Sequence, residues 1–141
     1  MFNSEHFNLM ESLSGVLPFL AYFITAVVMT GIFTFLYTLS TPHDELKLIK
    51  ENNVSAAISF VGALIGFIIP LTTAMNVSAN IVDFVIWGII ALLVQIILFY
   101  LIRFPFPKVI ERIKNGEAAM GILIAGISIA IGALNATAMN Y

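Results

Sequence analysis

The stretch Val54–Met75 reads VSAAISFVGALIGFIIPLTTAM and contains no charged residue. About 20 apolar residues of helix suffice to cross the hydrocarbon core of a bilayer. Three further stretches also lack Asp, Glu, Lys and Arg: Ser12–His43, Phe84–Ile102 and Ala118–Tyr141. The runs are continuous rather than alternating, which favours helices over barrel strands. We therefore predict an all-α integral membrane protein with four spans near Gly15–Leu39, Val54–Met75, Val82–Ile102 and Ala118–Met139.

Composition supports a single membrane domain over residues 1–141. The chain is 60% hydrophobic and only 10% charged, against about 25% charged in soluble domains. Four spans leave only short loops, so there is no room for a separate soluble catalytic domain. The net charge of −2 argues against nucleic-acid binding, and the lack of Cys excludes thiolate metal or redox sites.

The basic residues predict the orientation. All six lie in two loops, between spans one and two and between spans three and four: Lys47, Lys50, Arg103, Lys108, Arg112 and Lys114. Loops rich in Lys and Arg face the cytoplasm. We therefore expect a basic cytoplasmic face, with both termini outside.

The two basic loops resemble each other, which predicts two tandem helical-hairpin repeats at about residues 15–75 and 82–139. Each loop has Ile-Lys, then Asn, then Ala-Ala, and a shift of 62 residues maps Asn53 onto Asn115. Such repeats are related by an axis along the membrane normal. Thr41 before Pro42 reads as the cap of a short amphipathic helix in the first loop, and Pro105 and Pro107 predict another in the second.

Small residues line one face of spans two and four. In span two their spacing keeps them on one helical face, and adding 62 gives a matching set in span four. We expect these faces to pack together as the core of the bundle. Contact between subunits and a water-filled lining are the alternatives. The predicted packing residues are Ala56, Ser59, Ala63, Gly66, Pro70, Thr73, Ala118, Gly121, Ala125, Ser128, Gly132 and Asn135, with Gly62 on a neighbouring line.

Few polar side chains lie at depth. Gln95, near the middle of span three, needs a partner on another helix, and Thr30 and Thr34 of span one are candidates. Pro70 should kink span two, with Thr72 and Thr73 bonding the freed carbonyls. Aromatic residues near span ends, among them Tyr37, fit an interfacial belt.

No motif indicates an enzyme or a cofactor. His6 and His43 fall on opposite sides of the membrane and cannot share a metal. No Asp, Glu, Lys, Arg or His lies in the predicted bilayer core, whereas coupled transporters usually carry buried charges there.

The block TPHDELKLIK at residues 41–50 continues through Asn53, Ala56-Ala57, Gly62, Gly66 and Ile69-Pro70-Leu71. This pattern resembles the YjfL-like family, domain of unknown function 350. The resemblance implies a bacterial inner-membrane location. Family members often accompany a phage-shock-type protein and an ATP-grasp enzyme, which implies a role in envelope upkeep.

These observations favour a non-enzymatic membrane protein that acts through a homo-oligomer or a membrane-stress partner. The alternative is an oligomeric channel or passive conduit for a small solute or ion.

Overall fold

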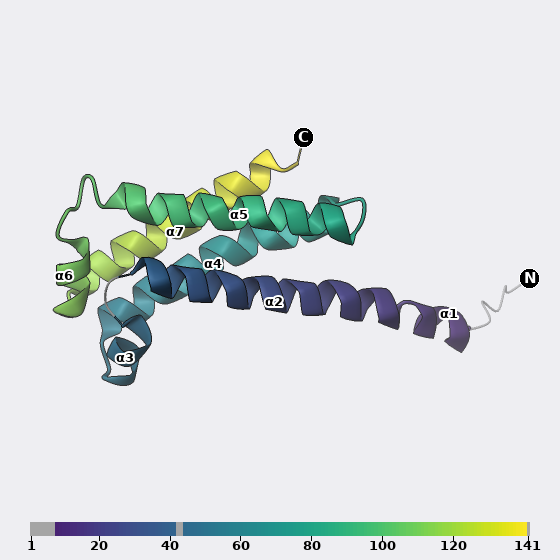
Figure 1. The fold of residues 1–141 in the computed structure, drawn as a ribbon, viewed down its shortest axis with the longest axis horizontal. Coiled ribbons are helices and arrows are strands. Elements are labelled where there is room, and N and C mark those ends of the chain that lie inside the picture. The colour runs from purple at the N-terminus through teal and green to yellow at the C-terminus, as the bar shows by residue number, and fades with distance from the viewer. Residues whose placement is uncertain (1–7, 42–43, 141) are drawn as a thin grey trace, which may run out of the picture.

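The computed structural model describes residues 8–41 and 44–140, and all regular structure in those ranges is helical. Four helices are long and apolar enough to cross a membrane, which confirms the four-span prediction. They are α2 (Val16–Ser40), α4 (Val54–Val77), α5 (Ile81–Ile102) and α7 (Ala118–Ala138). Figure 1 shows them side by side, with the two short helices α3 (Glu45–Lys50) and α6 (Val109–Lys114) together at one end.

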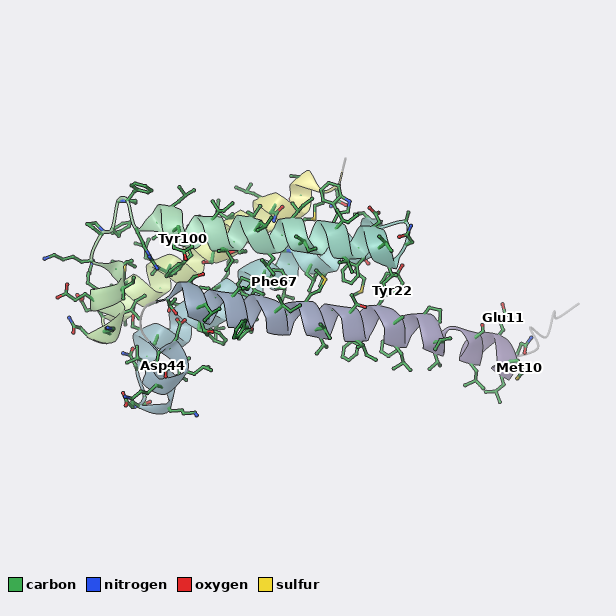
Figure 2. All side chains as sticks on the ribbon, viewed as in Figure 1. Met10, Glu11, Tyr22, Asp44, Phe67 and Tyr100 are labelled. Atoms are coloured by element: carbon green, nitrogen blue, oxygen red, sulfur yellow. The ribbon has the colours of Figure 1, made fainter. Side chains whose placement is uncertain are left out.

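The first span begins earlier than predicted. Helix α1 (Leu9–Ser14) precedes α2, and together they form one apolar helical segment from Leu9 to Ser40. The side chain of Asn8 accepts hydrogen bonds from the backbone N–H groups of Met10 and Glu11, so a polar cap starts the helix. In Figures 1 and 2, α1 projects beyond the bundle, and every residue of this helix is exposed.

The cap of the first short helix also differs from the prediction. Asp44, rather than Thr41, caps α3, because its side chain accepts a hydrogen bond from the backbone N–H of Lys47. Pro42 and His43 lie outside the described residues. Each short helix is followed closely by a residue with positive φ, Asn52 at 65° and Gly116 at 75°.

In the structure, corresponding features of the two loops are separated by a different number of residues from the 62 that the sequence predicts. The offset is 64 residues rather than 62 for the starts of the short helices (45 and 109), the positive-φ residues (52 and 116) and the starts of the following spans (54 and 118). Asn53, the N-cap of α4, therefore corresponds to Glu117, the N-cap of α7, and not to Asn115. The small residues of α4 and α7, by contrast, match each other at a shift of 62 residues. The loops and the small-residue faces are therefore related by different shifts. The tandem repeat itself stays a prediction.

The backbones of α4 and α7 touch. A Cβ atom added at Gly121 would lie 2.5 Å from the carbonyl oxygen of Ser55, and one added at Gly132 would lie 2.8 Å from the Cα of Gly66. A Cβ at Gly62 would overlap the backbone of Ala125. Only residues without bulky side chains permit this approach, which maximises dispersion contact between helices in lipid.

Most of the predicted packing residues are buried in this region: Ala56, Ser59, Ala63, Gly66, Pro70, Gly121, Ala125, Ser128 and Gly132. Thr73 and Asn135 are half-buried, and Ala118 is exposed. Gly121 already meets Ser55, the second residue of α4. One turn earlier, Ala118 therefore has no part of α4 to face, and this member of the predicted set was wrong.

Helix α2 joins the bundle through one narrow stripe. Its buried residues are Met29, Phe33 and Tyr37, spaced one turn apart. The rings of Phe33 and Phe67 stack with centroids 4.5 Å apart, and Figure 2 shows Phe67 between α2 and α5. Tyr37 is 2% exposed, so it is a core residue rather than part of an interfacial belt.

Two glycines of α7 provide a matched test of the backbone contact. Gly132→Ala should destabilise the protein by about 1–3 kcal/mol, because its methyl group would overlap the backbone of α4. Gly126→Ala should be neutral or slightly stabilising, since nothing lies within 4 Å of the added Cβ and alanine favours helix. Thermal unfolding of both variants in detergent checks this. Equal effects would contradict the packing.

Candidate functional site

Gln95 is the polar centre of the bundle. It is the one glutamine in the chain, and it is 4% exposed. Its side-chain Nε2 donates hydrogen bonds to the carbonyl oxygens of Gly66, at 2.9 Å, and Ser128, at 3.1 Å. One side chain on α5 therefore fastens both α4 and α7 at the level of their backbone contact.

The Gly66 carbonyl is the one that Pro70 leaves without its usual helical partner. In an unbroken helix the N–H of residue 70 would bond to it, and proline has no N–H. Gln95 supplies the missing donor. Thr72 and Thr73, which we expected to do so, instead hydrogen-bond to the carbonyl of Ile69. A hydroxyl on the same helix reaches back only to the preceding turn.

Thr30 and Thr34 do not pair with Gln95. Their hydroxyls donate to the carbonyls of Ala26 and Thr30 within α2 itself. The predicted interhelical partnership was therefore wrong. A threonine can satisfy its hydroxyl on its own helix, whereas the longer amide of Gln95 reaches between helices.

A second polar region lies at the end of the bundle that carries α3 and α6. Asn53 caps α4 through its Oδ1, which accepts from the backbone N–H of Ala56. Its Nδ2 donates to the carbonyls of Ile113 and Lys114, at 3.0 and 3.2 Å, and so satisfies the last turn of α6. The Ser55 hydroxyl donates to the Glu117 carbonyl at 2.7 Å. The two loops are therefore fastened to each other.

Five basic residues lie on the two short helices, or at the N-cap of α6 in the case of Lys108. Four of them are exposed and one is half-buried; together they form what we call the basic platform: Lys47, Lys50, Lys108, Lys114 and Arg112. Arg112 pairs with Glu117 at 3.1 Å. The apolar side of α6 is anchored, because Val109 and Ile113 are each 1% exposed.

Arg103 does not join the basic platform. Its Nη2 donates to the Ser40 carbonyl at 2.6 Å, at the end of α2, where a positive charge complements the helix dipole. Its guanidinium carbon lies 4.8 Å from the ring centroids of both Phe99 and Tyr100. Figure 2 shows Tyr100 at this end of α5. Arg103 therefore fastens α5 to α2, a role its charge alone did not reveal.

Glu45 is a site residue that its sequence pattern did not predict. As an acidic residue in the first turn of a short loop helix, it has the pattern of an exposed side chain. It is instead 1% exposed, with its Oε1 accepting a hydrogen bond from the Ser59 hydroxyl at 3.1 Å and lying 3.5 Å from the Tyr37 hydroxyl. Burial raises the pKa of the Glu45 carboxyl from 4.5 to about 7, although the two hydroxyls favour its charged form.

Two grooves on the described surface are apolar. One lies between α2 and α4 and is lined by Phe23, Val27, Ile68 and Leu71 among others. Another lies over Gly62 and Ala125. Within residues 8–41 and 44–140, no three His, Cys, Asp or Glu side chains gather as a metal site would require. The two grooves offer lipid contact, without the converging polar groups of a substrate pocket.

Four apolar helices, joined by side-chain hydrogen bonds at the centre and at one end of the bundle, define a multi-pass membrane protein embedded in the lipid bilayer. The chain belongs to the family described as Domain of Unknown Function (DUF350), whose model matches residues 10–139. It is 39% identical over 132 residues to the UPF0719 inner membrane protein YjfL of Escherichia coli K12, covering 94% of this chain and 100% of that protein. The protein of that name in Escherichia coli O157:H7 matches equally well. No solved structure matches.

A double-mutant cycle tests whether Gln95 and Pro70 are coupled through the Gly66 carbonyl. Gln95→Leu should cost about 1 kcal/mol of stability, the usual size of a hydrogen bond between membrane helices. Pro70→Ala restores a helical N–H for the Gly66 carbonyl, so Gln95→Leu should cost less in that background. Unfolding free energies of the four proteins in detergent measure the coupling.

The Thr30→Val substitution serves as the control, because its hydroxyl bonds within α2 and should show no coupling with Pro70. A cost of Gln95→Leu that is the same in the parent and in the Pro70→Ala background would show that the two residues do not share the Gly66 carbonyl.

Proposed function

We propose that the protein is a non-enzymatic component of the inner membrane that acts by binding an acidic partner protein on its basic platform. The observation that carries the proposal is the way α3 and α6 are fixed. Asn53 and Ser55 fix the start of α4 to the end of α6 and to Glu117 through backbone carbonyls, and Glu45 docks α3 on α4 through Ser59, so both helices that carry the basic side chains are held to the bundle. A pre-organised surface loses less entropy on binding than a flexible loop.

The charges of the platform favour an acidic partner. Lys47, Lys50, Lys108 and Lys114 are exposed. Interleaved acids such as Glu51 and Glu111 are exposed as well, a mixture less suited to a uniformly anionic lipid surface than to a protein with a matching charge pattern. We place this surface in the cytoplasm on the basis of the positive-inside rule.

The cellular setting in this proposal is envelope maintenance, as the family resemblance implies. Further copies of the chain are a second class of partner within the proposal. The outer side of α2 supports this, because Met29, Phe33 and Tyr37 are its only buried residues and side chains such as Phe35 and Leu39 are exposed, at 62% and 66%.

The conduit alternative has less support. A water-filled path needs an open, polar lining. Ala63, Gly66, Ala125 and Ser128 are the residues expected to line it, and they are buried in the contact between α4 and α7. Their burial supports their role as packing residues.

Reversal of the platform charge tests the proposal. We expect Lys47→Glu, Lys50→Glu, Lys108→Glu and Lys114→Glu in combination to abolish binding of the partner, because like charges would face each other. The matched control changes the same four residues to Arg and should retain the partner. Photochemical cross-linking in native membranes, which does not depend on the substituted lysine amines, followed by mass spectrometry of the cross-linked residues, measures both.

Recovery of the same partner at the same site by the Glu variant would overturn the proposal. Passage of a small solute through proteoliposomes of the purified protein, in that case, would replace it with the conduit.

A further inference from the structure

We propose that Glu45 is a proton-controlled latch, which holds α3 against α2 and α4 when its carboxyl is neutral and releases α3 when the carboxyl ionises. The latch concerns how α3 is held and goes beyond the partner surface proposed above. It uses contacts among described residues of three helices.

Glu45 anchors α3 in the bundle through polar contacts. The helix has six residues, too few to be stable without packing. Glu45 is its one buried residue; Leu48 and Ile49 are half-buried, while Leu46, Lys47 and Lys50 are exposed. Glu45 reaches Ser59 of α4 and Tyr37 of α2. Leu48 and Ile49 add apolar contacts with the cluster that includes Ala56 and Ile113, so expulsion of the carboxyl weakens the docking of α3 while part of its packing remains.

No positive charge compensates the buried carboxylate among the described residues. No Lys or Arg nitrogen there lies within 4 Å of it. The groups around it are Tyr37 from α2 and Ser59 from α4, while on its own helix Asp44 precedes it and Lys47 and Lys50 are exposed. Arg103 of α5 is engaged with the Ser40 carbonyl and the Phe99 ring. A buried charge without a partner is costly.

One carboxyl oxygen is left without any hydrogen-bond partner. Glu45 Oε2 is buried and unpartnered, while Oε1 takes the contacts from Ser59 and Tyr37. A buried neutral hydroxyl without a partner costs much less than a buried carboxylate oxygen without one, so this arrangement suits the protonated form. On ionisation both oxygens need donors, and water outside the bundle supplies them.

The direction of the pH effect follows from the two environments. The pKa of Glu45 is about 7 in the docked helix and 4.5 in its ordinary, hydrated state. Below the lower value both states are neutral and docking is strongest. Between the two values the released state loses its proton first, so release becomes about tenfold more favourable per pH unit. Above pH 7 both states are ionised and the effect levels off.

Release of α3 would also move two members of the basic platform, Lys47 and Lys50. This consequence rests on the proposed function, whereas the latch itself does not. A measurement on the purified protein without a partner therefore tests the latch alone.

Pulsed electron paramagnetic resonance measures the distance between two spin labels in a double-cysteine variant. The labels are attached at Leu46→Cys, in α3, and at Val82→Cys, at the far end of α5. The full chain has no native Cys, and both positions are exposed, at 49% and 65%. In lipid nanodiscs at about pH 5 we expect one narrow distance distribution. At about pH 8 a second, broader population should appear as α3 leaves the bundle, because the carboxyl is then ionised.

Added substitutions identify the responsible group. Glu45→Gln, which stays neutral, should keep the narrow distribution at both pH values. Glu51→Gln, an exposed acid just after α3, is the matched control and should respond like the parent. His43→Gln should also respond like the parent, because the latch assigns the proton to Glu45. Ser59→Ala should enlarge the released population at the higher pH, since it removes a hydrogen bond to the ionised carboxylate.

Identical distributions for the parent at the two pH values would overturn the latch. So would a Glu45→Gln variant that still responds to pH, or a His43→Gln variant that no longer does. If Glu45→Gln does not fold, a released population at the higher pH that Ser59→Ala fails to enlarge would overturn it equally.

Discussion

The close contact between the α4 and α7 backbones is the constraint on which the rest of the structure depends. In lipid the hydrophobic effect does not distinguish helix–helix contact from helix–lipid contact. The association must therefore come from close packing and hydrogen bonds. Gly62, Gly66, Gly121 and Gly132 remove the side chains that would hold the helices apart. The proximity then places the Gly66 and Ser128 carbonyls within reach of a single amide on α5.

The polar groups of the bundle act mainly at positions where backbone groups lack partners. Gln95 bonds to the carbonyl freed by Pro70, Asn53 bonds to the last carbonyls of α6, and Arg103 bonds to the end of α2. In each case at least one of these carbonyls lacks a donor within its own helix. Glu45 differs, because it is a buried carboxyl that bonds to two side-chain hydroxyls instead of a backbone group, with no Lys or Arg nitrogen within 4 Å among the described residues. This exception is why we assign it a role beyond packing.

The sequence predicts the spans and much of the packing face because contact with lipid excludes charged side chains along the whole length of a span. Val54–Met75 and its counterparts are recognisable by the absence of charge alone. The burial of Glu45 and Tyr37 could not be predicted in the same way. It depends on α3 folding back against α2 and α4, which no local pattern in residues 44–50 encodes. The polar residues Tyr37 and Ser59, near the same end of two spans, were the available signal.

The partners of Gln95 could not be predicted either, because they are backbone carbonyls. Every residue carries a carbonyl, so the sequence does not show which of them Gln95 binds. Only Pro70 marks one of them, since it identifies Gly66 as the carbonyl without a helical donor.

Solid-state nuclear magnetic resonance provides the most direct test of this arrangement. Since the chain has one Gln, protein made in a cell-free system with ¹⁵Nε-glutamine carries that label at Gln95 alone, and ¹³C-carbonyl glycine labels Gly66 among nine glycines. Dipolar dephasing in lipid bilayers should attenuate about one-ninth of the glycine carbonyl signal, as a 2.9 Å hydrogen bond to Gly66 requires. The absence of dephasing would contradict the arrangement of α4, α5 and α7 described above.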